Sequence, residues 1–397
     1  MMKRQIEVVL KNIICTKICP LCWSVFLLTM LCPAISAFSQ KDSLSEKEGL
    51  SRRIVNKWLN EEGDGSKYFF YPTLAYTPET SWEIGASALK LYRAKKDSSN
   101  RLSEIKSFGF ITLNKQYGGF LEHFIYTDKD KWFFLGKLKA QRFPLQYYGV
   151  GIDASKANEQ LIGADYLAIK ERVLHRIANN FFGGFELDFQ KVSRTLIEDL
   201  SERPSSILGI EGSRSLGLGL GLVYDSRQNA LNVRDGFFAE LAFLNYNKRF
   251  GNNFEFSSTN LDIRYFKSIR KNQVLAAQLF GLFVNGSTPF NMMALLGNES
   301  IMRGYYYGRF RDQNYLAAQV EYRFLPFGFS KRIGGVTFLS MGSVQPKVSQ
   351  FNFKDMLPAG GVGLRYLIFP KKDIFLRFDV GFTKEGQAFY IHTGEAF

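Results

Sequence analysis

Apolar and polar residues alternate over much of this chain with the period of two that a β-strand presents to its two faces. The segment DIFLRFDVGF (373–382) alternates large apolar residues with a face that carries Arg377 and Asp379. In YLAAQVEYRF (315–324) the polar face carries Glu321. Because the polar faces are rich in Gly, Arg, Asp, Glu and Gln, we expect them to line a wet lumen while the apolar faces meet lipid.

The length of the alternating segments distinguishes a membrane barrel from a soluble sandwich. Sandwich strands average about five or six residues, whereas strands of about 9–11 residues, tilted by about 45°, cross a hydrocarbon core. After the N-terminal region no stretch approaches 18 consecutive apolar residues, so transmembrane helices are not expected. Lipid offers the backbone no hydrogen bonds, so spanning strands must close on themselves. The sequence predicts an all-β fold, a single transmembrane antiparallel β-barrel.

Sixteen segments fit this pattern, an even number, as in single-chain bacterial barrels. They are 68–77, 81–93, 104–115, 117–127, 131–141, 161–174, 177–193, 214–226, 236–249, 253–268, 272–285, 313–325, 334–345, 357–369, 373–384 and 387–397. Their connections alternate between short charged turns, expected in the periplasm, and long loops. The clearest short turns are 127–131, 268–272 and 369–373, and the long loops are 142–160, 194–213, 286–312 and 346–356.

The region before the barrel contains two predicted segments. Residues 1–17 are basic, 18–31 are apolar, and small residues follow, which is typical of a secretory signal peptide spanning 1–39. Residues 40–67 predict a short amphipathic helical leader, which lies at the membrane surface or in the barrel mouth, or is only partly ordered. Its apolar positions at helical spacing are Leu50, Ile54, Val55, Trp58 and Leu59. The barrel is then expected to span 68–397.

The positions of the cysteines and the net charge limit the cofactors and binding partners that are expected. All four cysteines lie within the predicted signal peptide, so their C-x3-C-x2-C spacing is not expected to hold an iron–sulfur cluster. The formal net charge is +14. An exported chain rarely meets nucleic acid, so we expect no nucleic-acid partner. The anionic groups of outer-membrane lipid and lipopolysaccharide are the expected counter-charges.

Motifs that resemble chemical sites have simpler explanations. GLGLGLVYD (217–225) contains G-x-G-x-G, but alternation places these glycines on one face of a strand, and no helix follows as a phosphate loop requires. The three histidines, His123, His175 and His392, lie on different predicted strands. No metal pair, Ser/His/Asp set or carboxylate dyad emerges. We therefore predict no enzymatic activity, catalytic residue, cofactor or metal site.

Three segments together resemble the BamA/TamA-type outer-membrane assembly and translocation superfamily, also described as bacterial surface antigen barrels. Residues 221–243 are similar to its Tyr-Asp-(Ser/Thr)-Arg turn with a following glycine. Residues 301–327 are similar to its loop with Arg-Gly-(Phe/Tyr) and the next strand, and 360–397 to its last three strands. In the family this loop joins the eleventh and twelfth of sixteen strands, where our count also places it. The matching positions of the predicted periplasmic turn are Tyr224, Asp225, Arg227 and Gly236.

The resemblance implies an extracellular loop that folds into the lumen. Its Arg-Gly-(Phe/Tyr) positions are Arg303, Gly304 and Tyr305, and the family's glutamate partner for the arginine corresponds to Glu321. A planar guanidinium suits carboxylates, so a buried pair would fix the geometry of the loop. The alternative is an exposed loop with incidental charges.

One part of the family pattern is altered. The family's Phe-x-Asp-x-Gly motif on the thirteenth strand is FLSMG (338–342) here, so Ser340 replaces the acid. We expect this anchor of the loop to be weakened from a charge to a hydroxyl. Asp379, on the lumenal face of the fifteenth predicted strand, is the candidate for a second carboxylate.

The end of the chain resembles the C-terminal signal that the barrel-assembly machinery recognises when it inserts a new barrel. Its positions are Phe389, Ile391, Gly394 and Phe397. The alternative for Phe397 is an ordinary aromatic residue at the membrane interface.

The resemblance also implies a function and a location. Members of this family insert barrels into the outer membrane or move polypeptides across it, and they commonly carry periplasmic POTRA modules. Residues 40–67 are too few for one such module. We therefore expect a member lacking POTRA modules, located in the Gram-negative outer membrane, that assists insertion or translocation of client outer-membrane or secreted polypeptides. The alternatives are a passive channel or transporter for small solutes and a structural surface-antigen barrel.

Overall fold

A computed structural model describes residues 67–77, 81–97, 99–197, 207–227, 229, 232–370 and 373–397. The chain divides into two units, Met1–Trp58 and Leu59–Phe397, and all described residues belong to the second. The predicted signal peptide (1–39) and the leader (40–67), except for Lys67, lie outside the described residues and stay predictions.

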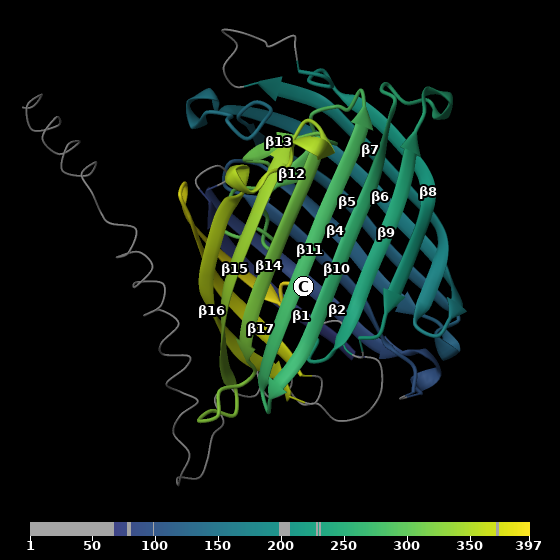
Figure 1. Cartoon of the computed structure of the whole chain (residues 1–397), viewed down its shortest axis with the longest axis vertical. Helices are drawn as coiled ribbons and strands as arrows, with labels where there is room; N and C mark the ends of the chain where they lie inside the picture. Colours follow the sequence, from purple (N-terminus) through teal and green to yellow (C-terminus); the bar gives the residue numbers. More distant parts are fainter. Residues whose placement is uncertain are drawn as a thin grey trace, which may run out of the picture. The chain divides into compact units, whose positions relative to one another are not determined.

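The described residues form one antiparallel sheet of sixteen strands in which neighbours in space are also neighbours along the chain (Figure 1). Its first eight strands are β1 (Lys67–Thr77), β2 (Ser81–Arg93), β3 (Leu102–Thr112), β4 (Tyr117–Tyr126), β5 (Trp132–Tyr147), β6 (Gln160–Ala178), β7 (Phe181–Ile197) and β8 (Ser213–Asp225). The others are β9 (Gly236–Tyr246), β10 (Phe256–Arg270), β11 (Gln273–Gly286), β14 (Asn314–Phe324), β15 (Ile333–Gln345), β16 (Leu357–Phe369), β17 (Ile374–Thr383) and β18 (Gly386–Thr393).

The remaining elements are short. β12 (Ala294–Leu296) and β13 (Phe310–Asp312) form a separate two-stranded ribbon in the connection between β11 and β14. Single 3-10 turns are η1 (Ala94–Lys96), η2 (Asp128–Asp130), η3 (Lys156–Asn158), η4 (Lys248–Phe250), η5 (Val348–Gln350) and η6 (Phe353–Asp355). Within the described ranges, no helix has the length and apolar character needed to cross a bilayer.

The all-β antiparallel fold predicted from the sequence is confirmed, and each predicted segment lies mainly on one strand of the large sheet, although 177–193 also includes the last two residues of β6. The largest boundary difference lies in β5, which continues to Tyr147 instead of ending at 141. At the other end of the chain, β18 stops at Thr393 instead of 397. Both differences arise from long-range packing, which a local alternation pattern does not report.

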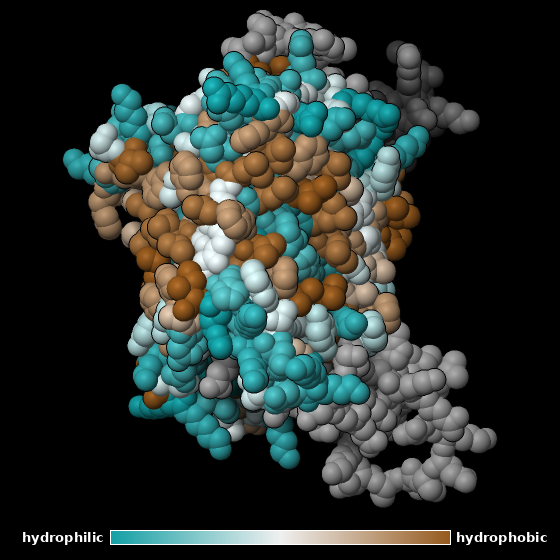
Figure 2. Space-filling model, turned by 90° about the vertical axis from the view of Figure 1, so that its right-hand side faces the viewer, coloured by the Kyte–Doolittle hydropathy of each residue, from teal (hydrophilic) through white to brown (hydrophobic). Residues whose placement is uncertain are grey.

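The two faces of the sheet differ as the alternation predicts. On β14, Val320 is exposed while its neighbours Gln319 and Glu321 are buried. Figure 2 shows a belt of hydrophobic residues between two more hydrophilic ends on one side of the molecule. Such a belt is the surface that lipid covers in outer-membrane barrels. Exposed large apolar residues include Phe185, Leu220, Leu241, Phe243, Leu279, Val320 and Leu339.

The two edge strands of the sheet, β1 and β18, do not pair with each other. β1 pairs with β2 and β18 with β17, and no other described strand pairs with either edge strand. On the inner side, the ring of Phe69 on β1 lies 4.1 Å from that of Phe369 on β16, and Ile374 of β17 belongs to the same buried cluster. The closure expected from the sequence is thus not a continuous hydrogen-bonded ladder among these residues. β18 is the shortest strand of the sheet and ends at Thr393.

Two ends of the sheet are distinguished below. The turn end carries the connections 94–101, 127–131, 179–180 and 226–235, and the loop end carries 148–159 and 287–313. At the turn end, inward-facing apolar residues of β4 to β9 pack into one cluster, so side chains fill this part of the interior. The cluster contains Tyr126, Phe133, Leu174, Phe182, Val223 and Phe238.

Candidate functional site

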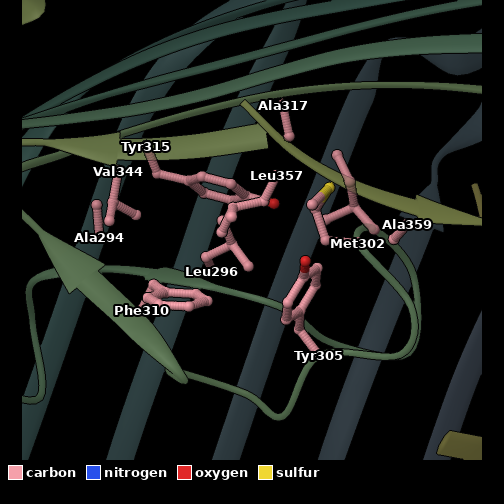
Figure 3. Packing of buried hydrophobic residues seen from close by; sticks show 11 residues of the cluster. Ala294, Leu296, Met302, Tyr305, Phe310, Tyr315, Ala317, Val344, Leu357 and Ala359 are labelled. Carbon is pink, nitrogen blue, oxygen red and sulfur yellow. The ribbon is translucent and has the colours of Figure 1, made fainter. Parts of the chain in front are cut away.

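The connection 287–313, called the loop below, packs against the inner faces of β14, β15 and β16 (Figure 3). Its ribbon pairs Leu296 with Phe310. Met302 and Tyr305 are almost fully buried. They share a cluster with residues of the sheet wall, namely Tyr315, Ala317, Val344, Leu357 and Ala359. Burial of this many apolar side chains ties the loop to the wall.

Arg303, at the tip of the loop, is completely buried between two carboxylates. Its Nη1 donates to Oδ2 of Asp379 at 2.6 Å, and its Nη2 donates to Oε1 of Glu321. The guanidinium carbon also lies 3.5 Å from the centre of the Phe338 ring. Charge-assisted hydrogen bonds and an aromatic face together stabilise the cation in a fully buried position.

Ser340 has a different role from the one expected. Its hydroxyl donates to the carbonyl of Ala359 at 3.4 Å and has no described contact with Arg303. Asp379 contacts the guanidinium in addition to Glu321, so the anchor is not reduced to a single carboxylate. Phe338, the first residue of FLSMG, was missed as a contact of Arg303, although the motif itself pointed to it.

Gly304 lets the loop backbone lie directly on β17. Its φ is +110°, and a Cβ there would lie 2.6 Å from Cγ2 of Thr383. Conversely, a Cβ on Gly381 would lie 2.6 Å from the carbonyl carbon of Arg303. The Gly304 N–H donates to the hydroxyl of Tyr390 at 3.0 Å. Two glycines therefore allow the close approach that places Arg303 between its carboxylates.

We predict that Gly304→Ala destabilises the folded protein by about 1–3 kcal/mol, because the side chain meets both a left-handed backbone and the wall. Gly328→Ala is the matched control, since a Cβ there has no neighbour within 4 Å. Urea unfolding in lipid vesicles measures both free energies of unfolding. Equal values for the two variants would contradict a tight backbone contact at Gly304.

Tyr305 completes the predicted Arg-Gly-Tyr unit. Its ring packs edge-on against Phe310 at 5.9 Å, and its hydroxyl donates to the carbonyl of Pro358 at 3.1 Å. Burial raises the pKa of Tyr305 to about 12, so the hydroxyl keeps the proton that this hydrogen bond uses.

Two further arginines hold the loop and were missed in the sequence. Arg309 donates to both carboxylate oxygens of Glu385, at 2.5 and 3.0 Å, and to the carbonyl of Ala154 at 2.9 Å. Arg311 is buried and donates to the carbonyl of Gln146 at 2.8 Å. One signal was available for the first pair, because Glu385 lies between the last two predicted strands, at the same end as the loop.

The predicted turn motif forms a second buried cluster at the turn end. Asp225 accepts hydrogen bonds from Nε and Nη2 of Arg227, at 2.9 and 3.0 Å, and from the hydroxyl of Tyr126 at 3.2 Å. Arg101, from the connection of β2 and β3, donates to the carbonyl of Asp225 and to the side chain of Asn180, both at 2.6 Å. This cluster joins the connections of several strand pairs.

Tyr224 and Gly236 frame this motif without entering its ion pairs. The ring of Tyr224 packs at 6.0 Å from Phe237, and Gly236 begins β9.

The C-terminal residues do not continue the last strand as expected. Phe389 and Ile391 are exposed, which fits an outward face of β18. Gly394, however, has a φ of +86° and follows the end of the strand. The last strand therefore ends before 397, where it was predicted to end. Phe397 is buried, which does not fit the alternative of an ordinary aromatic residue at the membrane interface. Its role in the C-terminal assembly signal stays a prediction.

The described ranges contain no group of three or more His, Cys, Asp and Glu side chains placed to hold a metal ion. The buried charges instead connect structural segments: the loop to the wall, and the turns to one another.

The large antiparallel sheet, its apolar outer belt and the loop anchored on the inner wall define an outer-membrane protein of the β-barrel class. The sequence profile of the Omp85 superfamily domain matches residues 118–397. This chain belongs to the Omp85 superfamily, and its resemblance to the BamA/TamA type is confirmed.

Solved structures share the fold at low sequence identity. BamA from Haemophilus ducreyi lacking POTRA domains 1–3 has a TM-score of 0.51 and 12% identity, covering 84% of this chain and 70% of that one. CdiB from Acinetobacter baumannii has a TM-score of 0.52 and 8% identity, covering 83% of this chain and 65% of that one. No curated protein matches the sequence significantly.

Proposed function

We propose that this chain assists the insertion or translocation of polypeptides at the bacterial outer membrane. The observation that carries the proposal is that the outer edges of β1 and β18, together called the seam, have no backbone partner among the described strands. The ring of Phe69 on β1 contacts that of Phe369 on β16, while each edge strand pairs with one described neighbour only. A strand edge without a partner is a template for pairing with another strand.

In this proposal the sheet closes into a sixteen-stranded barrel whose seam is its weakest joint. Elsewhere in the sheet, neighbouring strands are joined by backbone ladders, and the ladder between β14 and β15 is unbroken along the whole of β14. Opening any of those ladders in lipid would leave many backbone groups without partners. A client strand at the seam would instead add partners to edges that lack them.

The loop is the second element of the proposal. It lies against the inner wall, and Arg303 fixes it there through Glu321 and Asp379. We propose that this Arg-Gly-Tyr lock keeps the interior occupied until a client is engaged. The signal peptide would direct export and be cleaved, the barrel-assembly machinery would insert the barrel, and lipid and lipopolysaccharide would surround its apolar belt.

Crosslinking in cells tests the seam. Photoreactive residues at the exposed positions Tyr68 on β1 and Ile391 on β18 are expected to capture nascent outer-membrane barrels. Leu279 on β11 is the matched control, because it is also exposed but lies in the middle of the sheet. Capture at all three positions alike, or at none, would argue against the seam. In vesicles, a client insertion rate equal to that of protein-free lipid would refute the function itself.

A further inference from the structure

The last four residues, 394–397, are called the tail below and turn into the interior of the sheet. The Gly394 N–H donates to the carbonyl of Phe375 at 2.8 Å, and the positive φ of Gly394 directs the chain inward. The side chain of Glu395 is 2% exposed, and Phe397 is 4% exposed. The tail therefore occupies a site on the inner wall.

This site has two parts that suit different side chains. Nε of Arg365 donates to both carboxylate oxygens of Glu395, at 2.9 and 3.0 Å. The ring of Phe397 lies 5.9 Å from that of Phe266. The guanidinium of Arg323 lies 4.9 Å from the centre of the Phe397 ring. Nη2 of Arg323 also donates to the backbone oxygen of Phe397 at 3.2 Å. The apolar part of the site is completed by Val233 and Ala276.

Arg323 and Arg365, the two arginines of this site, also pair with the two carboxylates that bind Arg303 of the loop. Arg323 pairs with Glu321 at 2.7 Å and with Glu395 at 3.8 Å. Arg365 pairs with Asp379 at 2.6 Å as well as with Glu395. Since Glu321 and Asp379 both contact Arg303, the pairs close a ring of alternating charge. Its members in order are Arg303, Glu321, Arg323, Glu395, Arg365 and Asp379, each with a side chain at most 2% exposed.

The charge balance of this ring makes the loop sensitive to the tail. Arg377 lies 3.7 Å from Asp379, so the cluster holds four arginines and three carboxylate side chains. Loss of the Glu395 charge would make the net charge of the cluster more positive by one. Arg323 and Arg365 would then compete more strongly with Arg303 for Glu321 and Asp379. In a buried cluster such competition is only weakly screened.

We propose that this part of the inner wall is a peptide-binding site, that the tail fills it in cis, and that its occupation holds the loop in place. The ligand class is a short peptide segment with an acidic side chain two residues ahead of an aromatic one. Phe389 and Ile391 face outward on β18, so a straight continuation of that strand would carry Glu395 and Phe397 to the outer face. A tail extended in this way empties the site and loosens Arg303.

Hydrogen exchange of the full-length protein in lipid nanodiscs tests the site and its coupling without any client, so the result does not depend on the proposed function. In Glu395→Gln, amides of residues 301–310 are expected to exchange about tenfold faster, the factor that about 1.4 kcal/mol represents. Added peptide Gly-Glu-Ala-Phe should restore slow exchange in this variant, and Gly-Gln-Ala-Phe should not. Glu240→Gln breaks the lumenal pair with Arg172 outside the ring and should leave residues 301–310 unchanged.

A second substitution separates charge balance from general damage. Adding Arg377→Gln to Glu395→Gln returns the cluster to the net charge that it has in the unmodified protein, so exchange in 301–310 should slow again. Unchanged exchange in Glu395→Gln would overturn the coupling. Equally faster exchange in the loop and in β7, with no recovery in the double variant, would overturn it as well. Equal action of the two peptides would overturn the proposed selectivity.

Discussion

Replacing Arg303 by alanine is expected to release the loop and to lower the free energy of unfolding by about 3 kcal/mol. Removing one partner of a buried ion pair typically costs roughly 3–5 kcal/mol, because the remaining charge is left without compensation. We expect the lower end of this range, since Glu321 keeps Arg323 and Asp379 keeps Arg365 as partners. The loss also removes the contact with the Phe338 ring.

Urea unfolding in lipid vesicles measures this effect, and proteolysis of the loop reports its release from the wall. Arg194→Ala is the matched control, because the side chain of Arg194 is 78% exposed and lies 3.6 Å from Asp165. Exposed pairs of this kind contribute about 0–1 kcal/mol. An Arg303→Ala protein as stable as this control, with a loop equally resistant to protease, would show that Arg303 does not anchor the loop.

The sequence predicted those features that depend on local periodicity. Alternation along 315–324 places Glu321 on the inner face, and alternation along 373–382 does the same for Asp379. The resemblance supplied Arg303 as the residue that meets them. Two faces of a strand are set by the chain itself, so these assignments needed no knowledge of the neighbouring strands.

The features that escaped prediction depend on partners distant in sequence. Apolar and polar residues alternate through 387–397, but β18 ends at Thr393. Glu395 instead forms ion pairs with Arg365 and Arg323 on the inner side of the sheet. Arg309 likewise pairs with Glu385 across the loop end. A period of two indicates which face of the strand a residue occupies. It does not indicate whether contacts with distant residues stabilise a chain that ends the strand and turns inward.

Asp225→Asn is the second substitution expected to have a large effect, lowering the free energy of unfolding by roughly 3–5 kcal/mol. Asparagine preserves the shape but removes the charge that Arg227 and Arg101 face. It also turns an amide group, which donates hydrogen bonds, toward guanidinium donors. Because Arg101 links Asp225 to Asp130 and Asn180, hydrogen exchange should also accelerate in the connections 127–131 and 179–180.

Asp235→Asn in the same connection provides the control, because its carboxylate is 56% exposed and lies 4.0 Å from Lys267. A surface change of this kind is expected to stay within about 0.5 kcal/mol. If the two Asp→Asn proteins unfold at the same urea concentration, the Asp225 cluster adds no more stability than a surface turn. If instead Asp225→Asn alone is destabilised and exchange rises in connections far from it in sequence, one buried carboxylate holds the turns together. Because asparagine has nearly the same shape as aspartate, such a loss of stability would result from the lost charge and not from altered packing.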